Sequence, residues 1–140
     1  MNSILIVDDE ASIRKVLKIF LEKEGYKVSF ATKLSETYSV LKKKDFQLIL
    51  LDINLPDGNS LEYLKKIKTL SNNSSIIVMT AQDTMTNAIQ AIKNGAYDYI
   101  TKPFNFDDDF INTIEKAVKN SIKDNKIEKF ETDIKQYDMN

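Results

Sequence analysis

Apolar residues follow two different patterns along this chain. Five short runs are rich in branched and aromatic apolar residues, which is typical of β-strands. The predicted strands are Ser3–Val7, Tyr26–Thr32, Leu48–Leu51, Ile76–Met79 and Asp98–Thr101. Elsewhere apolar residues recur every three or four positions, which indicates amphipathic helices with one buried face. The predicted helices are Ser12–Lys23, Ser35–Lys43, Ser60–Leu70, Thr84–Asn94 and a last one that starts in the acidic run Asp107–Asp109.

The alternation of strands and helices predicts an α/β domain with a parallel sheet. The first, third and fourth runs are continuously apolar, whereas the second and fifth contain polar residues. Strands that are covered on both faces are apolar throughout, so the first three should be central and the other two should lie at the edges. With right-handed crossovers, the simplest such order is 2-1-3-4-5, a doubly wound five-stranded sheet with helices on both faces.

Polar residues follow four of the predicted strands. Asp8 and Asp9 follow the first strand, Asp52 follows the third, and Thr80 and Lys102 follow the fourth and fifth. Ligands of a doubly wound sheet bind at the carboxyl ends of its strands, near the point between strands one and three where the winding reverses. We therefore expect these five side chains to share one crevice.

Each of these residues also has a simpler explanation when it is taken alone. Asp8 or Asp9 could cap the first helix, and Asp52 could belong to a turn. Thr80 could simply end a strand, and a single lysine is usually solvated. Their convergence at one edge of the predicted sheet is what favours a functional site.

Composition and charge narrow the chemistry of that site. The 20 basic and 21 acidic residues give a net charge of −1, which argues against binding to nucleic acid or to an anionic membrane. Cysteine and histidine are both absent, so any metal must be bound by oxygen, which favours Mg²⁺ and also allows Mn²⁺. The lack of cysteine and of a long apolar segment leads us to expect a cytoplasmic protein.

Three neighbouring carboxylates repel one another, and a divalent cation would remove that conflict. Such a cation also assists phosphoryl transfer, with Asp52 as an oxygen nucleophile and with Thr80 and Lys102 binding phosphoryl oxygens. An aspartyl phosphatase is an alternative, but it usually needs a second acid two residues later, where this chain has Asn54. A module that only binds a partner is a third reading, but such a module should have lost one of Asp9, Asp52 or Lys102, and this chain keeps all three.

Four motifs resemble the receiver (CheY-like) domain of two-component response regulators. They are VDDE at 7–10, LLDINLPDG at 50–58, MTA at 79–81 and DYITKPF at 98–104, and the resemblance covers about residues 1 to 120. The segment that runs from MTA to the last motif is most similar to receivers of the NtrC-like, sigma-54 activator branch. The resemblance implies a flavodoxin-like fold and a signalling domain rather than an enzyme. The only chemistry of such a domain is its own phosphorylation and dephosphorylation.

The resemblance also implies a role for each site residue. Asp52 would be the phosphoacceptor, which takes a phosphoryl group from a sensor histidine kinase. Asp9, Asp52 and the backbone carbonyl of Asn54 would bind Mg²⁺, and Asp8 would help through water. Thr80 and Tyr99 would be the switch residues, Lys102 would bind phosphate, and the peptide bond from Lys102 to Pro103 would be cis. A departure from many relatives is Asn59-Ser60 in place of Asp-Gly, which affects the loop beside the site.

The sequence divides into a long domain and a short C-terminal segment. We expect residues 1–119 to form the receiver domain and residues 120–140 to be a charged linker or a helical extension. The extension contains Ile127, Phe130, Ile134 and Tyr137 at heptad-like spacing. We expect a homodimer after activation, formed through the fourth helix, fifth strand and fifth helix, and an effector domain outside this chain that regulates transcription.

Overall fold

The computed structural model describes residues 2–81 and 85–121. Five parallel strands form one sheet in the order β2-β1-β3-β6-β7. These strands are β1 (Ser3–Val7), β2 (Lys27–Ala31), β3 (Leu48–Asp52), β6 (Ser75–Thr80) and β7 (Asp98–Thr101). Since β6 and β7 are the fourth and fifth strands of the sheet along the chain, the predicted order 2-1-3-4-5 is confirmed.

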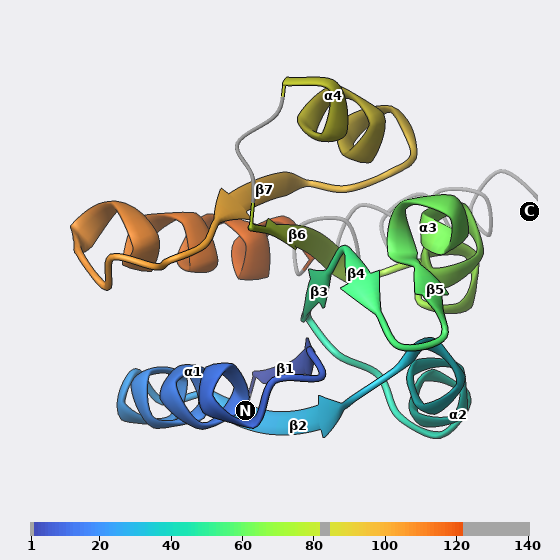
Figure 1. Ribbon diagram of the computed structural model, residues 1–140. Coiled ribbons are helices and arrows are strands. Elements are labelled where there is room, and N and C mark those ends of the chain that lie inside the picture. Colours follow the sequence, from blue (N-terminus) through green and yellow to red (C-terminus); the bar gives the residue numbers. More distant parts are fainter. Residues whose placement is uncertain (1, 82–84, 122–140) are drawn as a thin grey trace, which may run out of the picture.

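Helices cover both faces of this sheet. The helices are α1 (Ala11–Lys23), α2 (Leu34–Lys43), α3 (Ser60–Leu70), α4 (Met85–Lys93) and one over residues 108–121. Figure 1 shows α1 and the orange helix 108–121 on one side of the sheet, with α2, α3 and α4 on the other. Two hydrophobic clusters match these two layers, one on each face.

Burial confirms which strands are central. Every residue of β3 and β6 is buried, as are four of the five residues of β1, whereas β2 and β7 are mostly half-buried or exposed. The prediction that strands containing polar residues lie at the two edges is therefore confirmed. The carboxyl ends of the three central strands lie side by side, because β1 pairs with β3 and β3 pairs with β6 in parallel.

A second, two-stranded sheet was not predicted. The strands β4 (Asn54–Leu55) and β5 (Gly58–Asn59) form a small antiparallel hairpin between β3 and α3. Two-residue strands leave no periodic pattern in a sequence, so the apolar periodicity could not reveal them. This hairpin is the connection that follows Asp52, so its position affects the site.

The end of the last described helix bears on the expected domain boundary. Asp107 caps this helix, since its Oδ1 accepts a hydrogen bond from the backbone N–H of Phe110 at 3.0 Å. The helix continues to residue 121, where the Ser121 side chain is buried. The proposed boundary at residue 119 stays a prediction, and the expected extension with its heptad-like residues lies outside the described part of the chain.

Among residues 2–81 and 85–121, every helix is too short or too polar to span a bilayer.

Candidate functional site

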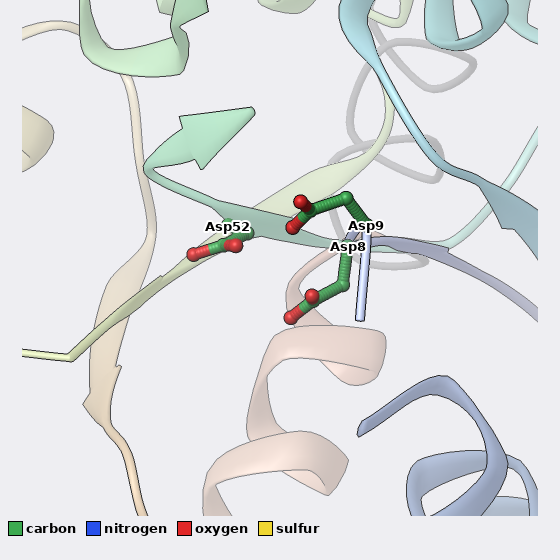
Figure 2. Close-up of side chains that lie close together, drawn as sticks. All are labelled: Asp8, Asp9 and Asp52. Carbon is green, nitrogen blue, oxygen red and sulfur yellow. The ribbon is translucent and has the colours of Figure 1, made fainter. Parts of the chain in front are cut away.

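Three carboxylates meet at the carboxyl edge of the sheet. Asp8 and Asp9 follow β1, and Asp52 is the last residue of β3, which pairs with β1 in parallel register so that Val7 lies opposite Leu51. Each of the three contributes a carboxylate oxygen, and these oxygens lie within 4.8 Å of one another. Figure 2 shows the three side chains grouped at the strand ends. The first part of the predicted site is therefore present.

Burial differs sharply among the three acids. Asp8 is 0% exposed and Asp52 is 7% exposed, whereas Asp9 lies at the surface. Asp8 is held in place by two donors: its Oδ1 accepts from the backbone N–H of Glu10 at 2.9 Å, and its Oδ2 accepts from Lys102. The site thus combines two buried carboxylates with one that faces solvent.

Lys102 joins the acidic cluster from the far side of β6. Its Nζ lies 2.7 Å from Asp8 Oδ2, 3.5 Å from Asp52 Oδ2 and 3.8 Å from Glu10 Oε1. Its backbone N–H donates to the carbonyl of Thr80 at 2.7 Å, and the peptide bond to Pro103 is cis, as the resemblance implied. The lysine is therefore anchored at its backbone while its ammonium group lies between the carboxylates.

Thr80 and Asn54 lie beside a small cavity next to the cluster. A cavity of about 170 Å³ is lined by Ile53, Asn54, Thr80, Ala81 and Asn87. Thr80 ends β6 and is 6% exposed. The cavity connects the end of β3 with the end of β6, which is where a group attached to Asp52 would need space.

Tyr99 lies apart from this group. It is in the edge strand β7, where its side chain is 36% exposed, and it pairs with Val78 rather than with the end of β6. In this structure Tyr99 contributes to the outer surface near α4. The role of a switch residue, which the resemblance implied for it, remains a prediction.

The electrostatics of the cluster favour an added positive charge. Burial and the nearby carboxylate of Asp8 raise the pKa of Asp52 from 3.8 to about 6, although Lys102 opposes this shift. Burial disfavours the charge on Lys102, but the hydrogen bond to Asp8 and the charge of Asp52 outweigh it and raise the pKa of the ammonium group. One ammonium group does not balance the surrounding carboxylates, so the all-oxygen donor set fits a hard divalent cation.

Sequence reasoning missed two residues that contact this site. Glu10 lies near Lys102, as the distances above show, and its position directly after Asp8-Asp9 was the available signal. Ser60 is fully buried, and its Oγ donates to the carbonyl of Asp52 at 2.5 Å. The sequence places Ser60 at the start of a predicted helix and in a departure from many relatives, not in the site. No local pattern reveals that its hydroxyl group reaches back to β3.

Comparisons with known proteins agree with this geometry. The family model described as response regulator receiver domain matches residues 4–115. The transcriptional regulatory protein SrrA of Staphylococcus aureus (strain NCTC 8325 / PS 47) is 38% identical over 103 residues, which is 74% of this chain and 42% of SrrA. The chain thus spans less than half the length of this curated relative.

Two solved receiver domains have the same fold. A CheY-like receiver domain protein from Methanospirillum hungatei JF-1 is 33% identical with a TM-score of 0.81, covering 89% of this chain and 98% of that one. The receiver domain of NtrC4, solved as a beryllofluoride-activated dimer, is 38% identical with a TM-score of 0.80, covering 86% and 99%. This chain therefore belongs to the response regulator receiver domain family.

Proposed function

We propose that this chain is a phosphorylation-activated switch of a two-component system, in which Asp52 accepts a phosphoryl group from a phosphohistidine of a sensor histidine kinase. The observation that carries this proposal is the environment of Asp52, which ends a central strand beside the carboxylate of Asp8 and the ammonium group of Lys102. A buried carboxylate in this setting is an oxygen nucleophile with a phosphate-binding cation beside it.

The acidic cluster would hold Mg²⁺, with Mn²⁺ as a possible substitute. Asp9, Asp52 and the backbone carbonyl of Asn54 are the proposed ligands, and Asp8 acts through water. When bound, the cation neutralises charge on the phosphoryl oxygens. The support for this assignment is the close grouping of three carboxylate oxygens and the raised pKa of Asp52, both of which call for positive charge.

Three residues of this chain take part in the proposed phosphoryl transfer. A carboxylate oxygen of Asp52 attacks phosphorus, the bond from phosphorus to the imidazole nitrogen of the donor breaks, and the electron pair stays on that nitrogen. Lys102 turns from the carboxylates to a phosphoryl oxygen, and the Thr80 hydroxyl donates to another. The product is an acyl phosphate, which water hydrolyses, so the signal is temporary.

The energy of the switch requires more than one contact. A hydrogen bond from Thr80 to a charged phosphoryl oxygen is worth about 1.5 to 3 kcal/mol. Moving a two-state equilibrium from 1:99 to 99:1 requires about 5.5 kcal/mol. We infer that Lys102 and a partner surface supply the rest, with Tyr99 changing rotamer as β7 and α4 adjust.

The proposed partner surface is apolar. Met85, Ile89 and Ile92 are 74%, 47% and 47% exposed, and their spacing places them along one side of α4. Tyr97 and Tyr99, near and in β7, are 39% and 36% exposed. The NtrC4 receiver was solved as an activated dimer, which supports homodimerisation of this chain through α4, β7 and the helix 108–121 after phosphorylation.

In this proposal, the effector domain that regulates transcription lies outside this chain. SrrA is a transcriptional regulatory protein that extends well past the matched region, which supports an effector domain for transcription outside this sequence. The balanced charge supports a signalling domain without direct contact to nucleic acid or membrane, and we propose a cytoplasmic location because the sequence has no cysteine. The similarity to the NtrC4 receiver supports membership of the NtrC-like branch.

Incubation with acetyl phosphate and Mg²⁺ tests the proposal. We expect one added phosphoryl group by intact mass in the wild type and none in Asp52→Asn, together with a tighter dimer by analytical ultracentrifugation. Labelling that persists in the variant would refute the site. Turnover of unrelated phosphoesters would favour a phosphatase, and equal dimer constants with and without beryllofluoride would refute the coupling.

A further inference from the structure

We propose that Asp57 is a positioning residue for the cation site: its carboxylate ties the β4–β5 hairpin to the start of α2 and so fixes the direction of the Asn54 carbonyl. This inference rests on the proposed function only in that Mg²⁺ binds at the acidic cluster. Nothing in the phosphoryl chemistry itself uses Asp57, which lies at the exposed tip of the hairpin.

The hydrogen bonds of Asp57 connect two segments that are distant in sequence. Oδ1 accepts from the backbone N–H of Leu34 at 2.8 Å, and Oδ2 accepts from the backbone N–H of Ser35 at 3.0 Å. The residue that precedes α2, Lys33, provides no side-chain cap. The first N–H groups of a helix have no partner within it, so the carboxylate of Asp57 acts as a cap that comes from another loop.

The charge state of Asp57 suits this cap. The backbone N–H of Leu34 is the largest influence that lowers the pKa of the Asp57 carboxyl, and the N–H of Ser35 adds to it. A carboxylate is also favoured at a helix N-terminus by the helix dipole. Asp57 is therefore ionised and doubly bonded at neutral pH, which makes it a directional anchor for the hairpin rather than a solvated surface acid.

The hairpin has a second anchor at its base. Ser60 donates its backbone N–H to the carbonyl of Ile53 at 2.8 Å and its hydroxyl to the carbonyl of Asp52. In an antiparallel ladder, hydrogen-bonded and non-hydrogen-bonded pairs alternate, so the next pair, Asn54 with Asn59, is not hydrogen-bonded. The carbonyl of Asn54 consequently points away from Asn59, and the placement of the whole hairpin sets its direction.

Close packing at the tip leaves little freedom while Asp57 is engaged. Gly58 has φ +152, and a Cβ added to it would lie 3.2 Å from Leu34 Cδ1 and 3.2 Å from Tyr63 Cε2. The tip therefore rests against the first residue of α2 and against α3. If the Asp57 bonds are lost, Ser60 still holds the base, so the fold survives while the tip and the Asn54 carbonyl move more freely.

A cation that requires strict coordination geometry should bind more weakly when the Asn54 carbonyl moves more freely. Mg²⁺ demands nearly ideal octahedral coordination, and loss of a residue that orients a metal ligand costs 10- to 100-fold in affinity as a typical range. Because Asp57 acts through the hairpin backbone, we expect the lower end of this range. Asp57→Ala should weaken Mg²⁺ binding by on the order of ten-fold. Asp57→Asn keeps one carbonyl oxygen as an acceptor and should fall between Asp57→Ala and the wild type.

Glu36 offers a matched control in the same helix turn. Glu36 lies in the first turn of α2, but its carboxylate accepts from the hydroxyl of Thr32 at 2.6 Å and from the backbone N–H of Thr32 at 3.3 Å. Glu36→Ala removes the same charge from the same helix end. Exposed charges at a distance are screened by salt, so this variant should change Mg²⁺ affinity by less than about two-fold.

The experiment measures Mg²⁺ dissociation constants of the four proteins by isothermal titration calorimetry, and then their phosphorylation rates with acetyl phosphate across a Mg²⁺ series. We expect Asp57→Ala to raise the dissociation constant and the half-saturating Mg²⁺ concentration far more than it lowers the maximal rate. Equal Mg²⁺ affinities for Asp57→Ala and Glu36→Ala, or a fall in maximal rate alone, would overturn the proposal.

The calorimetric arm separates this inference from the proposed function. If the wild type binds Mg²⁺ and Asp57→Ala binds it more weakly, but no protein is phosphorylated, the positioning role stands and the phosphoacceptor assignment fails. If the wild type is phosphorylated and Asp57→Ala matches it in Mg²⁺ affinity, the reverse holds. A wild type that binds no Mg²⁺ would overturn both.

Discussion

Replacing Asp52 by asparagine should stabilise the protein in the absence of divalent cations, even though it removes the proposed phosphoacceptor. The pKa of this carboxyl rises from 3.8 to about 6, first because it is buried and then because Asp8 is close. A raised pKa means that the fold favours the protonated acid. Well below pH 3.8 the side chain is neutral in both the folded and the unfolded state and costs nothing, whereas stability is lost as the pH rises through the window from 3.8 to about 6.

The size of the effect follows from that window. At about 1.4 kcal/mol per pKa unit, the interval between 3.8 and about 6 corresponds to about 3 kcal/mol. Solvent reaches part of the site and screens the charges, so we expect Asp52→Asn to gain about 1 to 2 kcal/mol in the free energy of unfolding at pH 7.5. The gain should be much smaller at pH 4, where the carboxyl of the folded wild type is mostly neutral.

Urea unfolding in a chelator, measured from pH 4 to pH 8, tests this reasoning. Asp9→Asn is the matched control, because Asp9 is exposed and its removal should change the free energy of unfolding by less than about 0.5 kcal/mol. Added Mg²⁺ should stabilise the wild type and leave Asp52→Asn almost unchanged. A variant that is less stable than the wild type at pH 7.5, or a gain that does not depend on pH, would refute the electrostatic account.

Two further predictions concern residues around the cluster. Lys102→Ala leaves the carboxylate of Asp8, which is 0% exposed, without its ion-pair partner, so we expect a loss of about 2 kcal/mol in urea unfolding and a pKa of Asp52 above about 6 in a carbon-13 NMR titration. An unchanged pKa would contradict the role given to Lys102. Ile89→Ser alters a side chain that is 47% exposed, so it should change stability by less than about 0.5 kcal/mol but weaken the beryllofluoride-induced dimer in analytical ultracentrifugation. A dimer as tight as that of the wild type would place the interface elsewhere.

The sheet and the acidic cluster could be predicted because they depend on local patterns and on one rule of topology. Continuously apolar runs separated the central strands from the edge strands, which contain polar residues, and right-handed crossovers then gave the simplest strand order. Parallel strands end at the same edge, so Asp8, Asp52 and Lys102 had to converge once the order was known. Nothing more than the sequence was needed for this part of the site.

The helix surfaces could not be predicted in the same way. Periodicity identified α4 but did not say which of its apolar residues pack on the sheet. In the structure Ala88 and Ala91 are buried, whereas Met85, Ile89 and Ile92 are exposed. Small side chains let α4 lie close to the sheet, and the larger ones remain exposed.

The contacts that position the site were also beyond sequence reasoning. Asp57 caps a helix that begins 23 residues earlier, and Ser60 reaches back to the carbonyl of Asp52. Such contacts depend on where loops lie in the folded chain, and neither periodicity nor composition encodes that placement. Glu10 near Lys102 is a different case, because it directly follows Asp8 and Asp9 and the strand order that brings Lys102 to the cluster also places it nearby.

Direct localisation of the phosphoryl group is the most decisive measurement. The wild type is incubated with acetyl phosphate and Mg²⁺, reduced with borohydride to convert any aspartyl phosphate to homoserine, digested, and sequenced by mass spectrometry. Our account predicts homoserine at position 52 alone, and only when Mg²⁺ is present. Homoserine at another acidic position, or a phosphoryl group that survives on a hydroxyl side chain while Asp52 is unmodified, would contradict it.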